Sequence, residues 1–400
     1  MQNDDKDTGN GENRRIPGVG TLLTHGGRNP QDQFGFVNTP VYRGSTVLFK
    51  TLDDLESRQQ RFYYGRAGTP TTESVEEIVT TLEGAHATQL VPSGLAAISI
   101  ALLSCVEAGD EVLITDSAYE PTRSFADTFL ARMGVTARYY DPRIGAGIAE
   151  LMSEQTKVVF CESPGSGTFE VQDLPAIAAA AHEHGARVII DNSWASPLYH
   201  RPLLLGADIV VHAGTKMFVG HSDAFAGTIS ANEATWPAIA KTRALLGYFT
   251  SGDEAFLVAR GLRTLEIRMA EHQARALEIA RWLEDQNEVE EVRHPALPIH
   301  PDHHIWQRDF SGSGSLFSFL LKPAPRASVA AFIDHLRLFS VGYSWGGFES
   351  LCLPVKPQSC RTAVPWTSNC NLFRLHIGFE DVADLKADLA DAIARYAAAR

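Results

Sequence analysis

Between about residues 72 and 212, short apolar runs alternate with longer stretches in which apolar residues recur at helical spacing. Some runs, such as Val188-Ile189-Ile190 and Ile209-Val210-Val211, are apolar at every position, which is typical of strands buried on both faces of a parallel sheet. We therefore predict an α/β fold, a mostly parallel sheet with helices on both faces. The predicted strands are 87–91, 111–115, 137–140, 157–161, 187–190 and 208–212, and the predicted helices are 72–82 (capped by Thr72), 96–106, 121–133, 148–153 and 174–184.

The pattern differs on both sides of this region. Residues 1–20 are polar and rich in turn formers, which predicts a flexible tail, and residues 21–62 have no clear period, which predicts an extended arm. We therefore divide the chain into a tail and arm (1–62), an α/β domain (63–258) and a smaller C-terminal α+β domain (259–400). The elements predicted for the last domain are helices 253–287, 327–336 and one from 381, and strands 289–292, 314–321 and 372–377.

Composition narrows the class of protein. The 400 residues carry 35 Lys and Arg against 48 Asp and Glu, a net charge of −13, which argues against nucleic acid or an anionic membrane as the main partner. No apolar run approaches the ~18 residues of a membrane span, and the N-terminus lacks the apolar core of a secretory signal. The five cysteines are an odd number, which favours reduced thiols and a cytoplasmic location over a disulfide scaffold.

Lys216 is the first residue that indicates a particular chemistry. It follows the apolar strand 208–212 and precedes Met217-Phe218-Val219, and lysine is rarely buried. One interpretation is a surface lysine whose stem lies along apolar neighbours. The other is an amine kept neutral by desolvation, which reacts with a carbonyl group.

Asp191 supplies a companion for this lysine. It ends the strand 187–190, twenty-five residues before Lys216, so both side chains are expected at the carboxyl edge of the parallel sheet, where α/β folds bind ligands. On its own Asp191 is equally well explained as a turn former. Together the two residues match pyridoxal phosphate, which needs a carbonyl-reactive lysine and an acidic partner for its pyridine nitrogen.

A phosphate group would need its own site. Ser93 and Gly94 lie between the strand 87–91 and the helix that follows, and the amides at a helix start bind anions, although a plain turn explains them equally well. Thr215, next to the lysine, could add a hydroxyl donor. Tyr119 follows the strand 111–115 and could stack on a pyridine ring, or it is simply a core tyrosine.

Other chemistries have weaker signals. The segment 220–224 lacks the last glycine of a nucleophile elbow, and 145–150 lacks the third glycine of a dinucleotide fingerprint. The histidines and cysteines do not have the spacing of metal ligands, so no metal is predicted.

Nine segments of the chain, in order, carry a family resemblance. They are Tyr64-Gly65-Arg66-Ala67-Gly68-Thr69, Ala118-Tyr119-Glu120-Pro121, Glu162-Ser163-Pro164-Gly165-Ser166, Ile190-Asp191-Asn192-Ser193-Trp194, Thr215-Lys216, Val219-Gly220-His221-Ser222-Asp223, Arg260-Gly261-Leu262-Arg263-Thr264-Leu265, the run 343–350 that contains Ser344-Trp345-Gly346-Gly347, and Arg374-Leu375-His376-Ile377-Gly378. From about residue 18 to 396 the chain resembles the cysteine/methionine-metabolism family of pyridoxal-phosphate enzymes, which have the aspartate-aminotransferase-like fold. It is most similar to the branch that cleaves the Cβ–S bond of cystathionine.

The resemblance implies roles for individual residues. Lys216 would bind the cofactor covalently, Asp191 would hold its pyridinium and Tyr119 would stack on its ring. The phosphate would be held by Ser93, Gly94, Leu95 and Thr215, and the substrate α-carboxylate by Arg374, with Ser344 and Trp345 beside it. Tyr64 and Arg66 would reach into the site of a neighbouring subunit, which implies a homodimer that shares its sites and assembles further into a tetramer.

The implied activity is a C–S β-lyase reaction in which cystathionine, or a related S-substituted cysteine, gives a thiol such as homocysteine, pyruvate and ammonia. Lys216 would move the Cα proton, with assistance from Tyr64. The alternatives are γ-elimination or γ-replacement on the same scaffold, and a non-catalytic binding protein. Ala213 and Met217 depart from the family pattern, and so does the segment 354–371, which we expect to reshape the substrate entrance.

Overall fold

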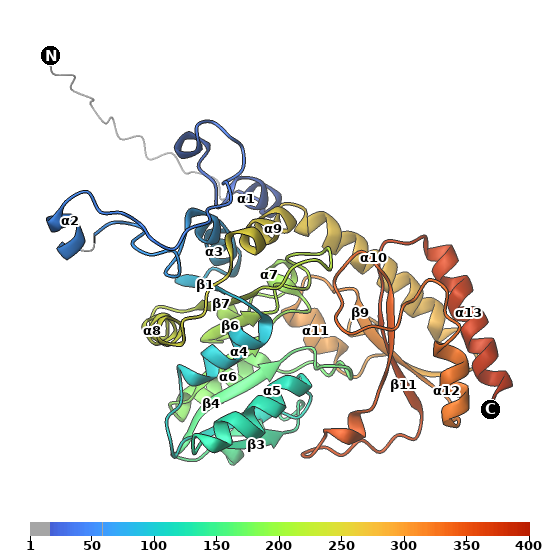
Figure 1. The fold of residues 1–400 in the computed structure, drawn as a ribbon. Coiled ribbons are helices and arrows are strands. Elements are labelled where there is room, and N and C mark those ends of the chain that lie inside the picture. Colours follow the sequence, from blue (N-terminus) through green and yellow to red (C-terminus); the bar gives the residue numbers. More distant parts are fainter. Residues whose placement is uncertain (1–16, 58) are drawn as a thin grey trace.

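The larger part of the molecule is built on a twisted sheet (Figure 1). In the computed structural model, which describes residues 17–57 and 59–400, seven strands lie in the order β1-β7-β6-β5-β4-β2-β3. All neighbours from β6 to β3 are parallel, whereas β7 runs antiparallel to both β1 and β6. The strands are β1 (Ala87–Val91), β2 (Glu111–Thr115), β3 (Thr136–Tyr140), β4 (Thr156–Glu162), β5 (Arg187–Asp191), β6 (Ile209–His212) and β7 (Gly227–Ala231).

Both faces of this sheet are covered, as the continuous apolar runs predict. In β4, neighbouring side chains point to opposite faces of the sheet and pack in different cores. Val158 and Phe160 lie in one core, and Val159 and Cys161 lie in the other. The first core is closed by α4 (Gly94–Leu103), η2 (Phe125–Leu130) and α8 (Trp236–Leu246), and the second by η3 (Gly145–Leu151), α6 (Leu174–Glu183) and η4 (Pro202–Leu205).

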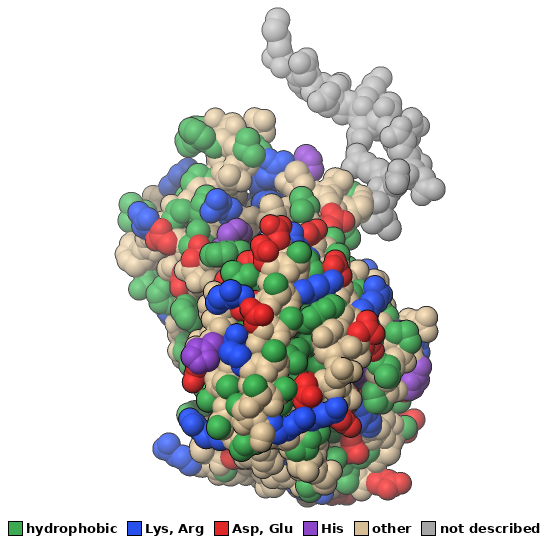
Figure 2. Space-filling view, turned by 90° about the vertical axis from the view of Figure 1, so that its right-hand side faces the viewer, with side chains coloured by type: hydrophobic (Ala, Val, Ile, Leu, Met, Phe, Trp, Pro, Cys, Tyr) green, Lys and Arg blue, Asp and Glu red, His purple; other side chains and the backbone are tan. Residues whose placement is uncertain are grey.

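The C-terminal region has a core of its own around an antiparallel sheet of order β10-β11-β9-β8. Figure 2 views the molecule from this side, where acidic and basic side chains are interspersed over the surface. The elements are α9 (Gly252–Leu262), α10 (Leu265–Glu284), β8 (Val289–Arg293), α11 (His303–Asp309), β9 (Leu316–Leu321), α12 (Arg326–Ile333), β10 (Leu351–Val355), η5 (Pro357–Ser359), β11 (Asn371–His376) and α13 (Val382–Ala398).

The predicted arm is mostly exposed and extends from the body (Figure 1), but it contains three short helical segments. They are α1 (Val19–His25), η1 (Pro30–Gln33) and α2 (Leu52–Ser57). Most of the predicted tail, residues 1–16, lies outside the described residues. Within the part of the chain that the structure describes, no helix is long and apolar enough to cross a membrane.

Several helix predictions need correction. The single helix predicted for 253–287 is two helices, α9 and α10, separated at Arg263 and Thr264. The helix predicted from Thr72 is α3 (Pro70–Glu83), whose N-cap is Thr69; Thr72 bonds back to Thr69 in a capping box, so the two threonines share the cap.

The other differences concern helix type and missed elements. The predicted helix 121–133 divides into α5 (Glu120–Ser124) and the π-helical η2, and 148–153 belongs to the 3-10 helix η3. The prediction missed β7, whose Gly-Thr-Ile-Ser-Ala sequence lacks a strong apolar run although every residue is buried. It also missed β10, α7 (Ser196–Tyr199), α8 and α11.

Candidate active site

A cavity of about 380 Å³ opens at the carboxyl edge of the large sheet. It lies where β4, β5 and β6 end, and the C-terminal region closes its other side with Tyr343, Ser344, Trp345 and Arg374. Of the predicted site residues, the structure brings the following to this cavity: Ser93, Gly94, Leu95, Tyr119, Asp191, Thr215, Lys216, Ser344, Trp345 and Arg374.

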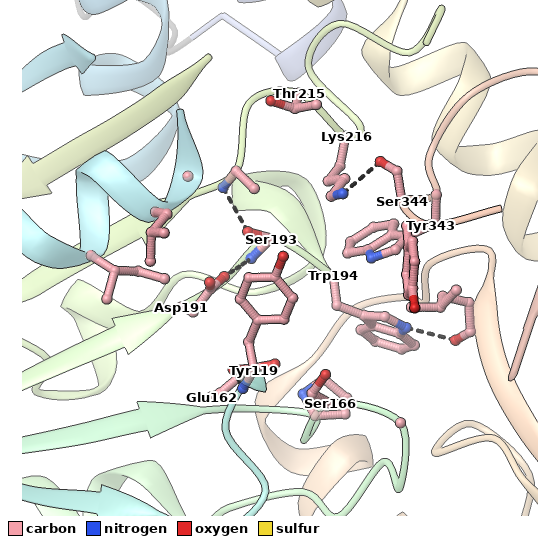
Figure 3. A pocket seen from close by; sticks show the side chains of 18 of the residues that line it. Tyr119, Glu162, Ser166, Asp191, Ser193, Trp194, Thr215, Lys216, Tyr343 and Ser344 are labelled. Carbon is pink, nitrogen blue, oxygen red and sulfur yellow. Dashed lines mark hydrogen bonds between the residues drawn. The ribbon is translucent and has the colours of Figure 1, made fainter. Parts of the chain in front are cut away.

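Lys216 points into the cavity from the turn that follows β6 (Figure 3). Its Nζ donates a hydrogen bond to Ser344 Oγ at 2.6 Å and lies 5.6 Å from the centre of the Trp345 ring. Burial, helped by the positive charge of Arg374, lowers the pKa of Lys216 to about 8, although Asp191 opposes the shift. The amine is therefore easily neutralised, and the surface-lysine interpretation is wrong.

The loop from residue 343 to 346 couples Lys216 to Arg374. Ser344 has a φ of 80°, a left-handed conformation that is costly for a non-glycine residue. Its Oγ accepts from Lys216 and its carbonyl oxygen accepts from Arg374 Nη2 at 3.0 Å. At Gly346 (φ 89°) a Cβ would come within 2.9 Å of the Lys216 backbone, so this loop and the lysine are tightly packed.

Arg374 lies on β11 and is partly buried, so it does not lie on a solvated strand face. Burial lowers the pKa of its guanidinium, but arginine is not deprotonated in proteins, so the group stays charged. A permanent, planar cation in a cavity wall suits a bidentate carboxylate.

Two carboxyl groups lie side by side at the strand ends. Glu162 and Asp191 are register partners on β4 and β5. Asp191 Oδ1 accepts from the amide of Ser193 at 2.8 Å, and Glu162 Oε2 accepts from the amide of Tyr119 at 2.7 Å. Burial, reinforced by the charge of Asp191, raises the pKa of Glu162 well above its ordinary value. Burial also raises the pKa of Asp191, and the hydrogen bonds from Ser193 oppose that rise.

The start of α4 faces the same cavity. Ser93 is its N-cap and its Oγ accepts from the amide of Ala96 at 3.1 Å. The first amides of a helix have no partner inside it, so those of Gly94 and Leu95 are oriented toward an anion at this end. The Thr215 hydroxyl donates to the Ala226 carbonyl (3.2 Å) and accepts from its amide (3.0 Å).

Tyr119 is half exposed at the cavity, so it is not a core tyrosine. Tyr64 and Arg66, in contrast, do not line the cavity of their own chain. The Arg66 guanidinium lies 5.8 Å from the Tyr64 ring centre and donates to the Ala244 carbonyl at 3.2 Å. Both residues are exposed.

Other cavity residues were not identified as site residues from the sequence. Glu162, Ser166, Ser193, Trp194 and Tyr343 all lie within segments that carried the family resemblance, which was the only signal for them. Ser193 Oγ accepts from the amide of Ala213 at 2.7 Å, which connects the loop after β5 to the loop that bears Lys216 (Figure 3).

Two further sequence features have structural explanations. In the segment 220–224, Ser222 Oγ donates to Glu349 Oε1 at 2.6 Å, with no histidine in the contact. The segment 354–371 does not line the cavity, so any effect that it has on the substrate entrance is exerted through the residues that do line it. Within residues 17–57 and 59–400, no three His, Cys, Asp or Glu side chains gather as metal ligands do.

These residues fit pyridoxal phosphate. The cavity holds a lysine that is easily neutralised, the carboxyl group of Asp191 at its floor and a helix N-terminus at one side, in a space of about 380 Å³. Lys216 would carry the aldehyde carbon, Asp191 the pyridine nitrogen, and the start of α4 the phosphate.

Comparison with known proteins agrees with this fit. The model of the family described as "Cys/Met metabolism PLP-dependent enzyme" matches residues 20–394. A Rhizobium johnstonii protein that is provisionally named a cystathionine β-lyase is 50% identical over 376 residues, which are 93% of this chain and 95% of that protein. The cystathionine β-lyase of Salmonella typhimurium is 41% identical over 386 residues, which are 94% of this chain and 98% of the enzyme.

The fold also has solved counterparts. The crystal structure of a cystathionine γ-lyase from Lactobacillus plantarum, complexed with L-serine, superimposes with a TM-score of 0.88 at 30% identity, and covers 95% of this chain and 100% of that one. One scaffold therefore accommodates relatives named for β- and for γ-chemistry.

Proposed function

This chain belongs to the family of pyridoxal-phosphate-dependent enzymes of cysteine and methionine metabolism, and we propose that it is a C–S β-lyase. It cleaves cystathionine, or a related S-substituted cysteine, to homocysteine or another thiol, pyruvate and ammonia. The observation that carries the proposal is the position of Lys216, a poised amine between Ser344 and Trp345 in the cavity that Arg374 also lines. Similarity to relatives named cystathionine β-lyase at 41% identity and above supports it. Membership of this enzyme family leaves no support for a non-catalytic binding protein.

The residues around the cavity divide the work of the reaction. Bound pyridoxal phosphate supplies an electron sink that is conjugated to the substrate Cα. Arg374 binds the substrate α-carboxylate and so fixes the orientation of Cα. Lys216 Nζ, neutral above pH of about 8, takes the Cα proton and later returns a proton to the departing thiolate.

The polar residues of the cavity hold the charges in place. Asp191 stays ionised to keep the pyridine nitrogen protonated, and the α4 amides after Ser93 bind the phosphate. Tyr119 covers the ring. Ser344 orients the Lys216 amine between its two proton transfers through the 2.6 Å hydrogen bond.

The site is completed by a second copy of the chain. Tyr64 and Arg66 lie away from their own cavity, on the side of the exposed arm, and in this proposal they enter the partner's site, where Tyr64 assists the proton transfer. The assembly is a homodimer that pairs further into a tetramer. We place the enzyme in the cytoplasm, because its five cysteines are free thiols.

The products test this function. Purified enzyme with cystathionine should release pyruvate as the dominant keto acid, because the Trp345 indole beside Arg374 narrows the space around Cβ and Cγ that γ-elimination requires. In Trp345→Leu the 2-oxobutyrate fraction should rise. If the wild type releases mainly 2-oxobutyrate, or substitutes thiols onto homoserine esters faster than it cleaves cystathionine, the β-lyase proposal is wrong and a γ-acting enzyme replaces it.

A further inference from the structure

The connection between β10 and β11, residues 356–370, leaves the C-terminal sheet and reaches the α5 side of the large domain (Figure 1). We name this connection the strap. It does not line the cavity. Its contacts nevertheless converge on two segments that do line the cavity.

The first contact is made through Asp116, which is 1% exposed directly after β2. Its carboxylate accepts from three consecutive strap amides, those of Thr362 (3.0 Å), Ala363 (3.0 Å) and Val364 (2.8 Å). Arg123 Nη1 donates to the same carboxylate at 2.9 Å. Because Asp116 precedes Tyr119 by only three residues, the strap fixes the segment that carries Tyr119 into the cavity.

The second contact is a buried ion pair. Arg361 of the strap lies 2.7 Å from Glu170 Oε1, with side chains that are 4% and 5% exposed. Arg361 also donates to Thr168 Oγ1, which in turn donates to Glu170 Oε2 at 2.6 Å. Removing one partner would leave an uncompensated buried charge, so this pair holds the end of the turn 163–170 firmly.

That turn forms one wall of the cavity. Pro164, Gly165, Ser166, Gly167 and Phe169 all line it. The turn is closed by the Gly165 amide, which donates to the Glu170 carbonyl at 2.9 Å, and it is tied to the Tyr119 segment by the Ser166 amide, which donates to the Ser117 carbonyl at 2.8 Å. Glu170 and Asp116 are therefore the outer ends of one hydrogen-bonded wall.

The strap continues directly into β11, where Arg374 lies only four residues beyond its end. We propose that the strap is a clamp that sets the position of this wall relative to Arg374, with Arg361 and Asp116 as positioning residues. It controls how well the cavity binds the part of the substrate between the α-carboxylate and the wall. The inference rests on the proposed function only for the choice of cystathionine as substrate.

Two variants test the clamp in the holoenzyme. Arg361→Met keeps the apolar stem but removes the ion pair, and Arg361→Met/Glu170→Gln also removes the charge that would be left unpaired, so the test stands even if the single variant does not fold. Both should speed amide hydrogen exchange in 163–170 by about tenfold or more, because local opening of the turn becomes easier. Both should raise KM for cystathionine by about tenfold with kcat within about twofold, since ground-state binding is what the wall provides. Arg361→Lys should recover part of both effects.

The control is Arg308→Met. It breaks a surface ion pair that also joins the C-terminal region to the large domain, in which Arg308 lies 2.7 Å from Asp173. It should change neither exchange in 163–170 nor KM. The clamp is refuted if exchange in 163–170 is unchanged in both Arg361 variants, or if it rises equally throughout the protein together with a lower Tm and an unchanged KM. A wild type that releases no pyruvate would refute the proposed function and leave the exchange result to decide the clamp.

Discussion

At the scale of residues, the cavity floor places two carboxyl groups together and separates their protonation. Glu162 has one hydrogen bond from a backbone amide and is buried beside Asp191, so its pKa is raised well above the ordinary value by burial and then by the charge of its neighbour. Burial also raises the pKa of Asp191, but hydrogen bonds from Ser193 and the positive charge of Lys216 counteract this. The stable arrangement is one proton on Glu162 and one negative charge on Asp191.

The two acids should therefore respond differently to the same substitution. Glu162→Gln replaces a protonated carboxyl by a neutral amide that still accepts from the Tyr119 amide, so kcat should stay within about threefold of wild type. Asp191→Asn removes the charge that stabilises a protonated pyridine, so kcat should fall by about a hundredfold or more. Steady-state kinetics near neutral pH give kcat for the wild type and for both variants. Equal losses in both variants would show that Glu162 is ionised.

Lys216 provides a pH-dependent prediction. Its pKa, lowered to about 8 by burial and by the Arg374 charge, means that the reactive neutral amine increases as the pH rises through that value. The rate at which cofactor-free enzyme takes up pyridoxal phosphate should rise with pH and level off above it. In Arg374→Met one repelling cation is gone, the ammonium form is favoured, and the midpoint should move to higher pH. Stopped-flow absorbance measurements give the midpoint for the wild type and for Arg374→Met. The control is Arg337→Met, which removes an exposed arginine of the C-terminal region. A midpoint that moves down in Arg374→Met would contradict the assigned coupling.

At the scale of elements, predictability followed the strength of the local signal. The buried parallel strands were located within one or two residues because apolar runs such as 188–190 are unambiguous. β7 was missed because its burial comes from pairing with β1 and β6, which the sequence does not display. The break at Arg263 and Thr264 was missed because both residues are acceptable in helices. At the site, Asp191 and Lys216 could be predicted because each follows an apolar run that indicates a buried strand. The contact of Ser344 with Lys216 joins residues 128 apart in the sequence, and only a structure reveals it.

The start of α4 yields a prediction of close packing. A Cβ at Gly94 would come within 2.6 Å of Ala213 Cβ, on the loop that leads to Lys216. Gly94→Ala should therefore push α4 away from that loop, weaken pyridoxal-phosphate binding by about tenfold or more and cost about 1–3 kcal/mol of stability. Equilibrium dialysis and thermal unfolding measure the two effects. Gly109→Ala is the matched control: its φ of 97° makes alanine strained, but no atom lies nearby, so stability should fall while cofactor affinity stays. Cofactor affinity lost equally in both variants would point to general destabilisation.

At the scale of the whole molecule, the arm carries apolar side chains that one chain does not cover. Phe34 is 97% exposed and Leu48 is 83% exposed, and the arm projects from the body in Figure 1. Such a surface is typical of a segment that packs on another protein. A second copy of the chain is the partner that would also explain why Tyr64 and Arg66 lie away from their own cavity, and a shared site would then make each monomer incomplete.

Mixing two inactive variants tests this arrangement. If each site takes Lys216 from one chain and Arg66 from the other, Lys216→Ala and Arg66→Ala homodimers each lack one group in every site. A mixed dimer has one site with both groups intact and one site with neither. Random exchange of equal amounts makes half of the dimers mixed, so about a quarter of all sites, and about a quarter of wild-type pyruvate formation, should return. Native mass spectrometry verifies the exchange. Mixed dimers that form without recovering activity would place Arg66 in its own chain's structure, through its hydrogen bond to the Ala244 carbonyl, and the shared site would have to be abandoned.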